Sequence, residues 1–288
     1  MTEGDDAGVT RTRVVEFRAK APFEFRQHNV GPKGAQKAPG GEVYYTTAEA
    51  FANAVLVRAP EQFRILDPAK RLACLAPARW SGFDFAGKRV LFLLPAQALG
   101  EAVGIFLFLQ AVRERFPTVH LAVACAQSPA DIYGLDPLIE VFTLWIGKKR
   151  LAGFDTLIDL GHVAARRDID VWPVDMEAEL LAAFDLSASQ AYGSAARTIA
   201  PLARLEIGIL PLATSPLRTL PLAATRALAA ALGEWGNVSL CLNKTQQQGR
   251  LYAREMAVQL PDDIQVIDGF AAIGDLMAAI RGFDYAVF

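Results

Sequence analysis

Cysteine is scarce in this sequence, and its spacing excludes two common uses of the residue. The three cysteines of the 288 residues, Cys74, Cys125 and Cys241, lie far apart. They form neither the paired spacing of a metal site nor the framework of a disulfide-stapled domain. Cys125 and Cys241 fall inside apolar, strand-like runs. We therefore expect buried thiols in a protein of the reducing cytoplasm.

Long apolar runs and an excess of one charge are also lacking. The longest apolar stretch, residues 102–112, has about half the length that a helix needs to cross a bilayer. Residues 1–13 are polar and acidic, unlike a signal peptide. The formal net charge of −2 and the pI of 6.0 give no global reason to expect nucleic acid as a partner. The sequence predicts a soluble, cytoplasmic protein and leaves open a peripheral contact with the inner membrane face.

Apolar residues are plentiful instead. Hydrophobic residues make up 52% of the chain and charged residues 21%, a globular composition with length for two domains. Residues 1–87 are expected to form an N-terminal extension of irregular α+β texture, without a recognisable motif. Its first 12 or so residues are predicted to be a loose tail, and residues 14–26 alternate like a strand or hairpin. A short helix is predicted to begin at Thr46 or Thr47.

The texture changes at residue 88, where continuous apolar runs begin to alternate with helical segments. This alternation indicates parallel sheets covered on both faces. In a first lobe, residues 88–200, the predicted strands are 89–95, 119–126, 137–145 and 154–161, and the predicted helices are 98–115 and 175–186. In a second lobe, residues 201–288, the predicted strands are 205–213, 237–243, 264–270 and 284–288, and the predicted helices are 221–236, 245–260 and 271–282.

Two such units predict an α/β fold with two Rossmann-like parallel-sheet lobes facing a cleft. Residues 187–204 are expected to bridge the lobes, because they are rich in Ser, Gly, Ala and Arg. In open parallel sheets, ligands bind beyond the carboxyl ends of the strands. The loops after Pro95, Gly161, Ala213 and Asn243 are therefore the places to look for chemistry.

Glu101 is the first candidate in these loops. It follows the first strand of the first lobe, in the first turn of a helix, and is flanked by Gly100 and Ala102. A lone carboxylate there could act as a general base on a hydroxyl that attacks an activated carbon. The helix macrodipole, which stabilises such an acid by about 0.3–1 kcal/mol, could equally account for it. The loop lacks a G-x-G-x-x-G dinucleotide fingerprint.

The loop after the first strand of the second lobe, "LATSPLRTLP", is the second candidate. Thr214 and Ser215 offer hydroxyls, and Arg218 offers a cation before a helix that starts near Pro221. Together with the N–H groups of that helix, they suit a phosphate or diphosphate. Ordinary capping of the helix by a hydroxyl, with a solvated arginine, is the alternative.

A third candidate, "DLGHVAARR", ends the last strand of the first lobe. Asp159 and His162 could contact a substrate, and Arg166 with Arg167 could meet an anionic acceptor. The alternative is a hydrogen-bonded histidine beside solvated arginines.

The order of these segments resembles the bacterial lipopolysaccharide heptosyltransferase family, glycosyltransferase family 9, over about residues 88–288. "VLFLLPAQALGEAV" is similar to that family's first strand and its small-residue loop ending in Gly-Asp. "FDTLIDLG" resembles its "yDlvIDlqg" strand, and "LPLATSPLRTLP" resembles its "hpgas…K.Wp" segment. "FAAIGDLMAAIRGFDYAVF" resembles the helix and strand that precede its donor-binding loop. The resemblance implies the GT-B fold.

The resemblance also implies a reaction. Family members invert the anomeric carbon without a metal or other cofactor. They move a heptose-like sugar from a nucleotide-sugar donor, such as ADP-heptose, to a lipid-linked, glycan or protein acceptor. Glu101 falls where the family carries its catalytic Asp, in the loop that also holds Gly100. Arg218 falls where a Lys contacts the donor's phosphates, and Thr214 lies in the adjoining segment.

Three residues depart from the family's pattern: Glu101 replaces Asp, Arg218 replaces Lys, and Leu220 replaces the Trp before Pro221. The family's Asp-x-Gly-x-x-His donor loop is expected just after "DYAVF", where the sequence ends. We therefore expect either a fragment or a degenerate relative that binds nucleotide-sugars weakly. Two alternatives to the transferase are a non-catalytic GT-B-like binding or assembly protein and a nucleotide-sugar epimerase of similar fold.

Overall fold

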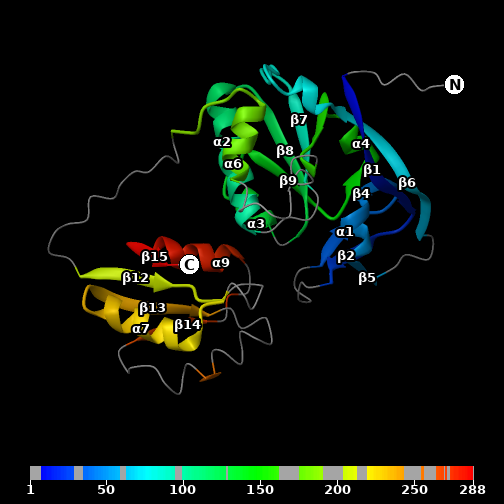
Figure 1. Cartoon of the computed structure of the whole chain (residues 1–288). Coiled ribbons are helices and arrows are strands. Elements are labelled where there is room, and N and C mark those ends of the chain that lie inside the picture. The colour runs from blue at the N-terminus through cyan, green and yellow to red at the C-terminus, as the bar shows by residue number, and fades with distance from the viewer. Residues whose placement is uncertain are drawn as a thin grey trace. The chain divides into compact units, whose positions relative to one another are not determined.

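The computed structural model of the chain contains two compact units, Met1–Gly193 and Ser194–Phe288 (Figure 1). The residues that the structure describes are 8–28, 35–58, 63–94, 99–127, 129–161, 175–190, 204–212, 219–242, 254–255, 264–268, 270 and 273–287.

The first unit is built around a four-stranded parallel sheet, here called sheet C. Its strands are β7 (Arg89–Leu93), β8 (His120–Cys125), β9 (Ile139–Thr143) and β11 (Thr156–Asp159), in the order β11-β7-β8-β9. Each lies within a run that the sequence predicted as a strand. The short helix α3 (Ala130–Tyr133) follows β8.

Two helices, α2 (Leu99–Arg115) and α6 (Met176–Ala183), cover one face of sheet C. Phe108 of α2 packs edge-on against Phe92 of β7, with ring centroids 5.9 Å apart, and reaches Phe184 at 5.2 Å. The two helices approach closely at Gly104. A Cβ on that glycine would lie only 3.0 Å from the backbone nitrogen of Glu177, so a larger residue would push the helices apart.

The other face of sheet C is covered by strands instead of helices. The antiparallel sheet A has the order β10-β4-β1-β6. Its strands are β1 (Val9–Ala19), β4 (Glu42–Thr47), β6 (Phe63–Leu75) and β10 (Ile146–Gly147). β1 includes residues 9–12, which the sequence assigned to a loose tail. That expectation was wrong, because β6 supplies their hydrogen-bonding partners along the ladder from Val9 to Val14.

An apolar layer joins sheets A and C. Val14, Tyr45 and Cys74 of sheet A pack with Leu91 and Leu93 of sheet C. The N-terminal segment is therefore an ordered β-layer that completes the core of the first unit, rather than an irregular extension beside it.

A second small antiparallel sheet, sheet B, packs on the far side of sheet A. Its order is β3-β2-β5, with strands β2 (Phe23–Gln27), β3 (Gln36–Ala38) and β5 (Ala54–Arg58). The fully buried Phe17 of β1 lies at the centre of the contact. Its ring is 5.2–6.3 Å from five aromatic neighbours, which are Phe23, Phe25, Tyr44, Phe51 and Phe63.

Three short elements complete the first unit: α1 (Ala48–Ala52), the 3-10 helix η2 (Pro77–Arg79) and α4 (Lys148–Leu151). The side chain of Thr47 caps α1, because its Oγ1 accepts a hydrogen bond from the Ala50 N–H at 3.1 Å. Of the two threonines that the sequence proposed, Thr47 therefore caps the helix.

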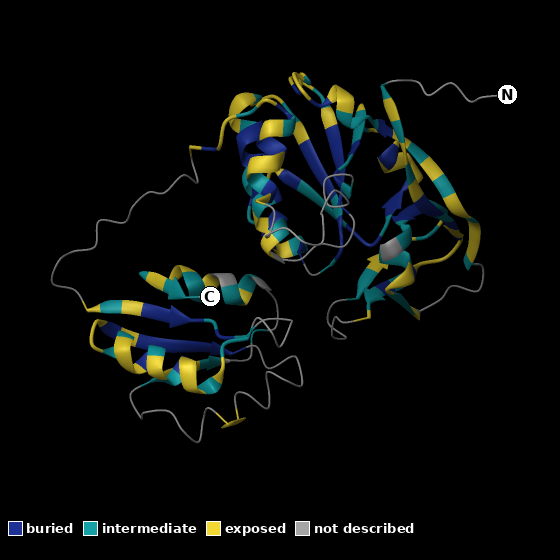
Figure 2. Cartoon of the chain, in the orientation of Figure 1, coloured by how far each residue is buried: buried dark blue, intermediate teal, exposed yellow. Residues whose placement is uncertain are grey.

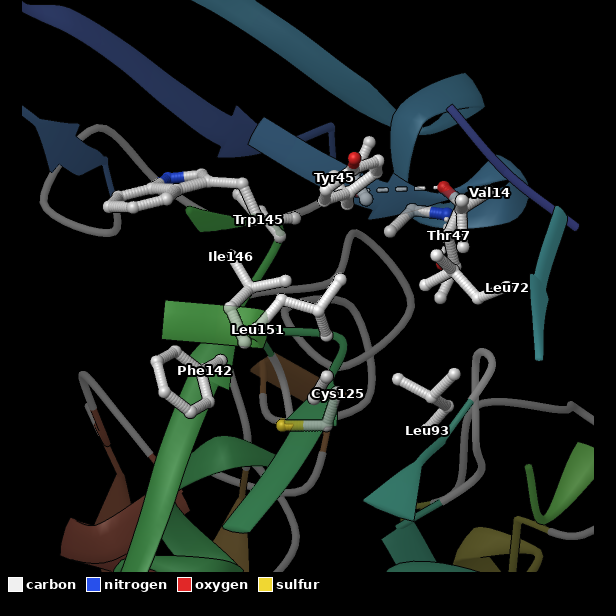
Figure 3. A pocket seen from close by; sticks show the side chains of 14 residues that line it. Val14, Tyr45, Thr47, Leu72, Leu93, Cys125, Phe142, Trp145, Ile146 and Leu151 are labelled. Atoms are coloured by element: carbon white, nitrogen blue, oxygen red, sulfur yellow. Dashed lines mark hydrogen bonds between the residues drawn. The ribbon is translucent and has the colours of Figure 1, made fainter. Parts of the chain in front are cut away.

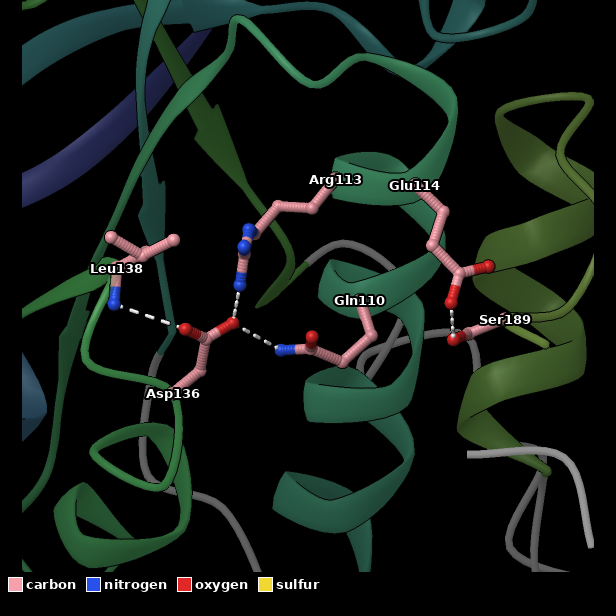
Figure 4. A network of polar contacts seen from close by, with 6 residues as sticks. All are labelled: Gln110, Arg113, Glu114, Asp136, Leu138 and Ser189. Atoms are coloured by element: carbon pink, nitrogen blue, oxygen red, sulfur yellow. Dashed lines mark hydrogen bonds and ion pairs between the residues drawn. The ribbon is translucent and has the colours of Figure 1, made fainter. Parts of the chain in front are cut away.

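A polar network ties the end of α2 to the turn before β9 (Figure 4). The buried Asp136 accepts hydrogen bonds from Gln110 Nε2 at 2.8 Å and from the Leu138 N–H at 3.0 Å, and it forms an ion pair with Arg113. Each carboxylate oxygen of this buried acid thus has a donor, as burial of a charge requires. The network holds β9 at the edge of sheet C.

The second unit repeats the parallel arrangement in sheet D, whose order is β14-β13-β12-β15. Its strands are β12 (Leu205–Ile209), β13 (Gly236–Leu242), β14 (Gln265–Asp268) and β15 (Tyr285–Val287), all parallel. The helices are α7 (Leu222–Gly233) and α9 (Ile273–Arg281). They match the predicted elements, whereas the predicted helix 245–260 lies almost wholly outside the described residues.

We predict that Phe17→Ala destabilises the protein by about 3–5 kcal/mol, because it leaves a cavity among five packed rings. Urea denaturation of the whole chain, followed by circular dichroism, measures the change. Val57→Ala is the control, since Val57 is 47% exposed and should cost little. A loss below about 1 kcal/mol for Phe17→Ala would contradict a central role for this cluster.

Candidate functional site

The carboxyl edge of sheet C contains the three predicted site residues that the structure describes. The strand order reverses between the neighbouring strands β7 and β11, so that the chain leaves their carboxyl ends at a topological switch point. Leu93 at the end of β7 is paired with Asp159 at the end of β11. Gly100 and Glu101 open α2, the next described segment after β7.

Glu101 is half-buried in the first turn of α2. Its negative charge affects the pKa of the fully buried Tyr133 of α3. The sequence did not identify Tyr133 as a site residue. Burial raises the pKa of the Tyr133 phenol, and the nearby Cys125 and Glu101 raise it further. Glu101 follows β7, whereas Cys125 ends the neighbouring strand β8 and Tyr133 follows it. All three residues therefore lie at the carboxyl edge of sheet C. Tyr133 therefore stays a neutral hydrogen-bonding group beside the candidate base.

Gly100 leaves space beside Glu101. It is exposed, and among the described residues no atom would lie within 4 Å of a Cβ built on it. Packing against the described residues therefore does not require a glycine at this position.

The carboxylate of Asp159 forms hydrogen bonds within the protein, which the sequence did not predict for an acceptor-binding residue. One carboxylate oxygen accepts a hydrogen bond from the Thr12 hydroxyl at 2.5 Å, and the other accepts one from the Gly161 N–H at 2.8 Å. The Cys74 thiol lies 3.4 Å from the same hydroxyl. Asp159 thereby fastens β1 of the N-terminal layer to β11. The sequence could find a carboxylate at a strand end, but not this partner 147 residues away.

The other predicted site residues, His162, Arg166, Thr214, Ser215 and Arg218, lie outside the described residues. In the second unit, the strand order reverses between β12 and β15. The segment that carries Thr214, Ser215 and Arg218 follows β12, which is where a switch point would place a ligand. Their role in phosphate binding stays a prediction.

A cavity lies where sheet A meets the carboxyl halves of β7, β8 and β9 (Figure 3). Tyr45 and Thr47 border one side of it, and Leu93, Cys125 and Phe142 border the other. Nearly all of its walls are apolar, whereas a sugar needs several polar partners for its hydroxyls. The Trp145 indole at its rim has a buried Nε1 without a hydrogen-bond partner. We assign this cavity to sheet packing and not to the sugar site.

The described residues contain no group of three or more His, Cys, Asp or Glu side chains that could hold a metal ion. Cys74, Cys125 and Cys241 are all buried, and the sequence predicted this burial from the strand-like runs around Cys125 and Cys241. Among the described helices, none is long and apolar enough to cross a membrane.

Neither a protein-family model nor a curated protein sequence matches this chain. A glycosyltransferase of family 9 from Veillonella parvula has a similar structure, with a TM-score of 0.51 and 14% sequence identity. The match covers 72% of this chain and 77% of that chain. The likeness shows that this chain has the fold of that transferase, an α/β fold of the GT-B type with two parallel sheets. It confirms the expected fold class.

Two heptosyltransferases of Escherichia coli are less similar. WaaC, bound to ADP-2-deoxy-2-fluoro heptose, has a TM-score of 0.49 and 14% identity, over 69% of this chain and 81% of that chain. TibC, described as dodecameric and iron-containing, is bound to ADP-D-beta-D-heptose. Its TM-score is 0.44 and its identity 10%, over 99% of this chain and 73% of that chain.

The buried thiols of the first unit predict a loss of stability at alkaline pH. Burial raises the pKa of Cys74 to about 11 and that of Cys125 to about 12. From about pH 9 the unfolded chain ionises first, so the stability that is present below pH 9 is lost as the pH rises toward these values. At pH 10, each thiol should cost about 1.4 kcal/mol. Urea denaturation at pH 8 and pH 10 measures this loss.

The double variant Cys74→Ala, Cys125→Ala isolates the contribution of the thiols, because every other titrating group is shared with the parent. Its stability should fall less between pH 8 and pH 10, by about 2–3 kcal/mol. The same pH dependence in variant and parent would show that these thiols ionise as readily in the folded protein as in the unfolded chain.

Proposed function

We propose that this protein is an inverting, metal-independent glycosyltransferase. It moves a heptose-like sugar from a nucleotide-sugar donor to a lipopolysaccharide-type, other glycan or protein acceptor, in the cytoplasm or at the inner face of the membrane. The observation that carries the proposal is the position of Glu101. A carboxylate opens α2 beside a topological switch point, in a chain with the fold of a family 9 glycosyltransferase.

In the proposed reaction, a hydroxyl oxygen of the acceptor attacks the anomeric carbon of the donor sugar. The Glu101 carboxylate takes the proton of that hydroxyl as the new C–O bond forms. The bond between the anomeric carbon and the diphosphate breaks on the opposite face, and its electron pair leaves with the diphosphate. Because the hydroxyl attacks the face opposite the leaving diphosphate, the configuration of the anomeric carbon is inverted. The acceptor is proposed to lie beside the exposed Gly100 at the start of α2.

The leaving diphosphate gains negative charge, which must be stabilised without a metal. The Arg218 guanidinium and the hydroxyls of Thr214 and Ser215 are proposed for this role, since each can donate hydrogen bonds to phosphate oxygens. The acceptor is assigned to the first unit, with His162 and Arg166 as candidate contacts. Asp159 would act there through its position rather than as a free acid, because its carboxylate already accepts bonds from Thr12 and Gly161.

A non-catalytic protein with the same fold is the second candidate function. It is favoured by the internal hydrogen bonds of Asp159 and by the replacement of the family's Trp with Leu220. The two candidates differ in a direct assay. The whole chain is incubated with ADP- and UDP-sugars and a glycan acceptor, with and without a chelator. Sugar transfer that persists with the chelator supports the enzyme, whereas binding of nucleotide without transfer supports the second candidate.

We predict that Glu101→Gln lowers turnover by about 10²–10⁴, the usual contribution of a positioned base. Folding and donor binding should be preserved, because the amide has nearly the same shape. Glu101→Asp, which restores the family's residue, should keep substantial activity. Steady-state kinetics and thermal denaturation are measured on each variant.

Glu179→Gln provides the matched control, since Glu179 is an exposed acid in the first turn of α6. It should leave turnover unchanged. If Glu101 only complements the helix dipole, Glu101→Gln will cost about 0.3–1 kcal/mol of stability and leave turnover at the level of the parent. That result would end the catalytic assignment.

We further predict that Arg218→Ala weakens binding of a nucleoside diphosphate by about 1.5–3 kcal/mol, the range of a charge-assisted hydrogen bond. Isothermal titration with ADP and UDP measures the change. Arg218→Lys should retain most of the affinity, and Arg281→Ala, which removes an exposed arginine of α9, should have no effect. Equal affinity of Arg218→Ala and the parent would remove Arg218 from the phosphate site.

A further inference from the structure

The ribbon formed by β1 and β6 concentrates positive charge in a protein whose net charge is −2. Its two acidic residues are Glu16 and Asp67. Its six basic residues are Arg11, Arg13, Arg18, Arg64, Lys70 and Arg71. The ribbon therefore carries a net charge of +4, and the remainder of the chain must carry −6.

The register of the ribbon places like charges side by side. Arg13 is directly opposite Arg71, and Arg18 is directly opposite Arg64. Like charges in facing positions destabilise an antiparallel pair. Within the described part of the chain, none of these four arginines forms a salt bridge that would offset the repulsion.

Three of the arginines share one face of the ribbon. Thr12 and Val14 point toward sheet C, where Thr12 bonds to Asp159 and Val14 enters the apolar layer. Because side chains alternate along a strand, Arg11 and Arg13 point the opposite way, and Arg71 shares the face of its partner Arg13.

Two aliphatic side chains accompany them. Val9 alternates in step with Arg11, and Ile65 is paired with Phe17, which lies in step with Arg13. Val9 is 37% exposed and Ile65 is 45% exposed. We call these five residues, Val9, Arg11, Arg13, Ile65 and Arg71, the arginine face. Arg11, Arg13 and Arg71 are exposed, and most of β6 is drawn as exposed or intermediate in Figure 2.

Protection of an edge strand explains only part of this pattern. β6 is the edge of sheet A, and charged side chains on an edge strand prevent pairing with other proteins. Single charges on β6, such as Arg64 and Lys70, would suffice for that purpose. Arg11 and Arg13 lie on the neighbouring strand, and Arg13 adds repulsion to the ladder. The repulsion would be offset by a partner that supplies several negative charges at once.

We propose that the arginine face docks on an anionic lipid bilayer through the phosphates of its headgroups. A guanidinium binds a phosphate through two parallel hydrogen bonds, and Arg11, Arg13 and Arg71 offer three guanidinium groups on one sheet face. Val9 and Ile65 can enter the headgroup region while the arginines stay at the phosphates.

The exposed apolar neighbours favour a bilayer over nucleic acid. Proteins that bind single-stranded nucleic acids stack bases on aromatic side chains. The described exposed apolar side chains of this ribbon are aliphatic, whereas its two aromatic residues, Phe17 and Phe63, pack into the cluster between sheets A and B. The proposal does not depend on the transferase activity, because docking is measured without donor or acceptor.

Vesicle sedimentation with the whole chain tests the proposal. The parent should bind vesicles of phosphatidylglycerol and phosphatidylcholine in equal parts, but not vesicles of phosphatidylcholine alone. Each arginine near an anionic surface strengthens binding by about fivefold. The triple variant Arg11→Gln, Arg13→Gln, Arg71→Gln should therefore bind about a hundredfold more weakly. Binding by the parent should also fall at about 0.5 M salt, where the Debye length shrinks to about 4 Å.

Two variants separate docking from general charge and from folding. The variant Arg115→Gln, Lys148→Gln, Lys149→Gln changes the net charge equally at exposed positions outside the ribbon, and it should bind like the parent. Replacement of the three arginines of the face by lysine should restore most of the binding. The melting temperature of the glutamine variant should equal or exceed that of the parent, because the pair Arg13 and Arg71 repel each other.

Three results would overturn the proposal. The first is a parent that ignores anionic vesicles, and the second is a glutamine variant that binds them as well as the parent does. The third is a parent that binds a labelled oligonucleotide through the same three arginines but does not bind vesicles, which would reassign the face to nucleic acid.

Discussion

The packing of sheet A onto sheet C is the constraint on which the rest of the first unit depends. Parallel strands are buried on both faces and need an apolar cover on each. Here α2 and α6 cover one face, and β1, β4 and β6 provide the other cover through Val14, Tyr45 and Cys74. The N-terminal residues are therefore part of the core of the parallel-sheet unit. Removing that layer would expose Leu91 and Leu93 to water.

The same packing decides what the sequence could reveal about the fold. The parallel strands were predictable because Val90, Leu91, Phe92 and Leu93 form a continuous apolar run. β1 begins with alternating threonines and arginines, a pattern that is also typical of a solvated tail. Only the structure shows that Thr12 donates a hydrogen bond to Asp159. β6 contains Pro68, which argues against a strand. The structure accommodates it at the edge of the sheet, where the pairing with β1 shifts register.

The candidate site was predictable only as far as local rules reach. Glu101 could be found because strand, loop and first helical turn are contiguous in the sequence, and a switch point lies at strand ends. Tyr133 could not be found, since its proximity to Glu101 depends on how α3 packs beside α2. Asp159 was found at the right place, but its partner Thr12 depends on a long-range pairing that no local pattern encodes.

These contacts link the candidate site to the outer surface of the N-terminal layer. Thr12 bonds to Asp159 at the carboxyl edge of sheet C, and its neighbours Arg11 and Arg13 extend from the opposite face of the same strand. The register of β1 is fixed by this packing, because a slip by one residue would exchange its buried and exposed faces. A partner that holds Arg11 and Arg13 would therefore also hold Thr12, and through it the end of β11. Binding at the outer face of the N-terminal layer would in this way reach the carboxyl edge of sheet C through the hydrogen bond between Thr12 and Asp159.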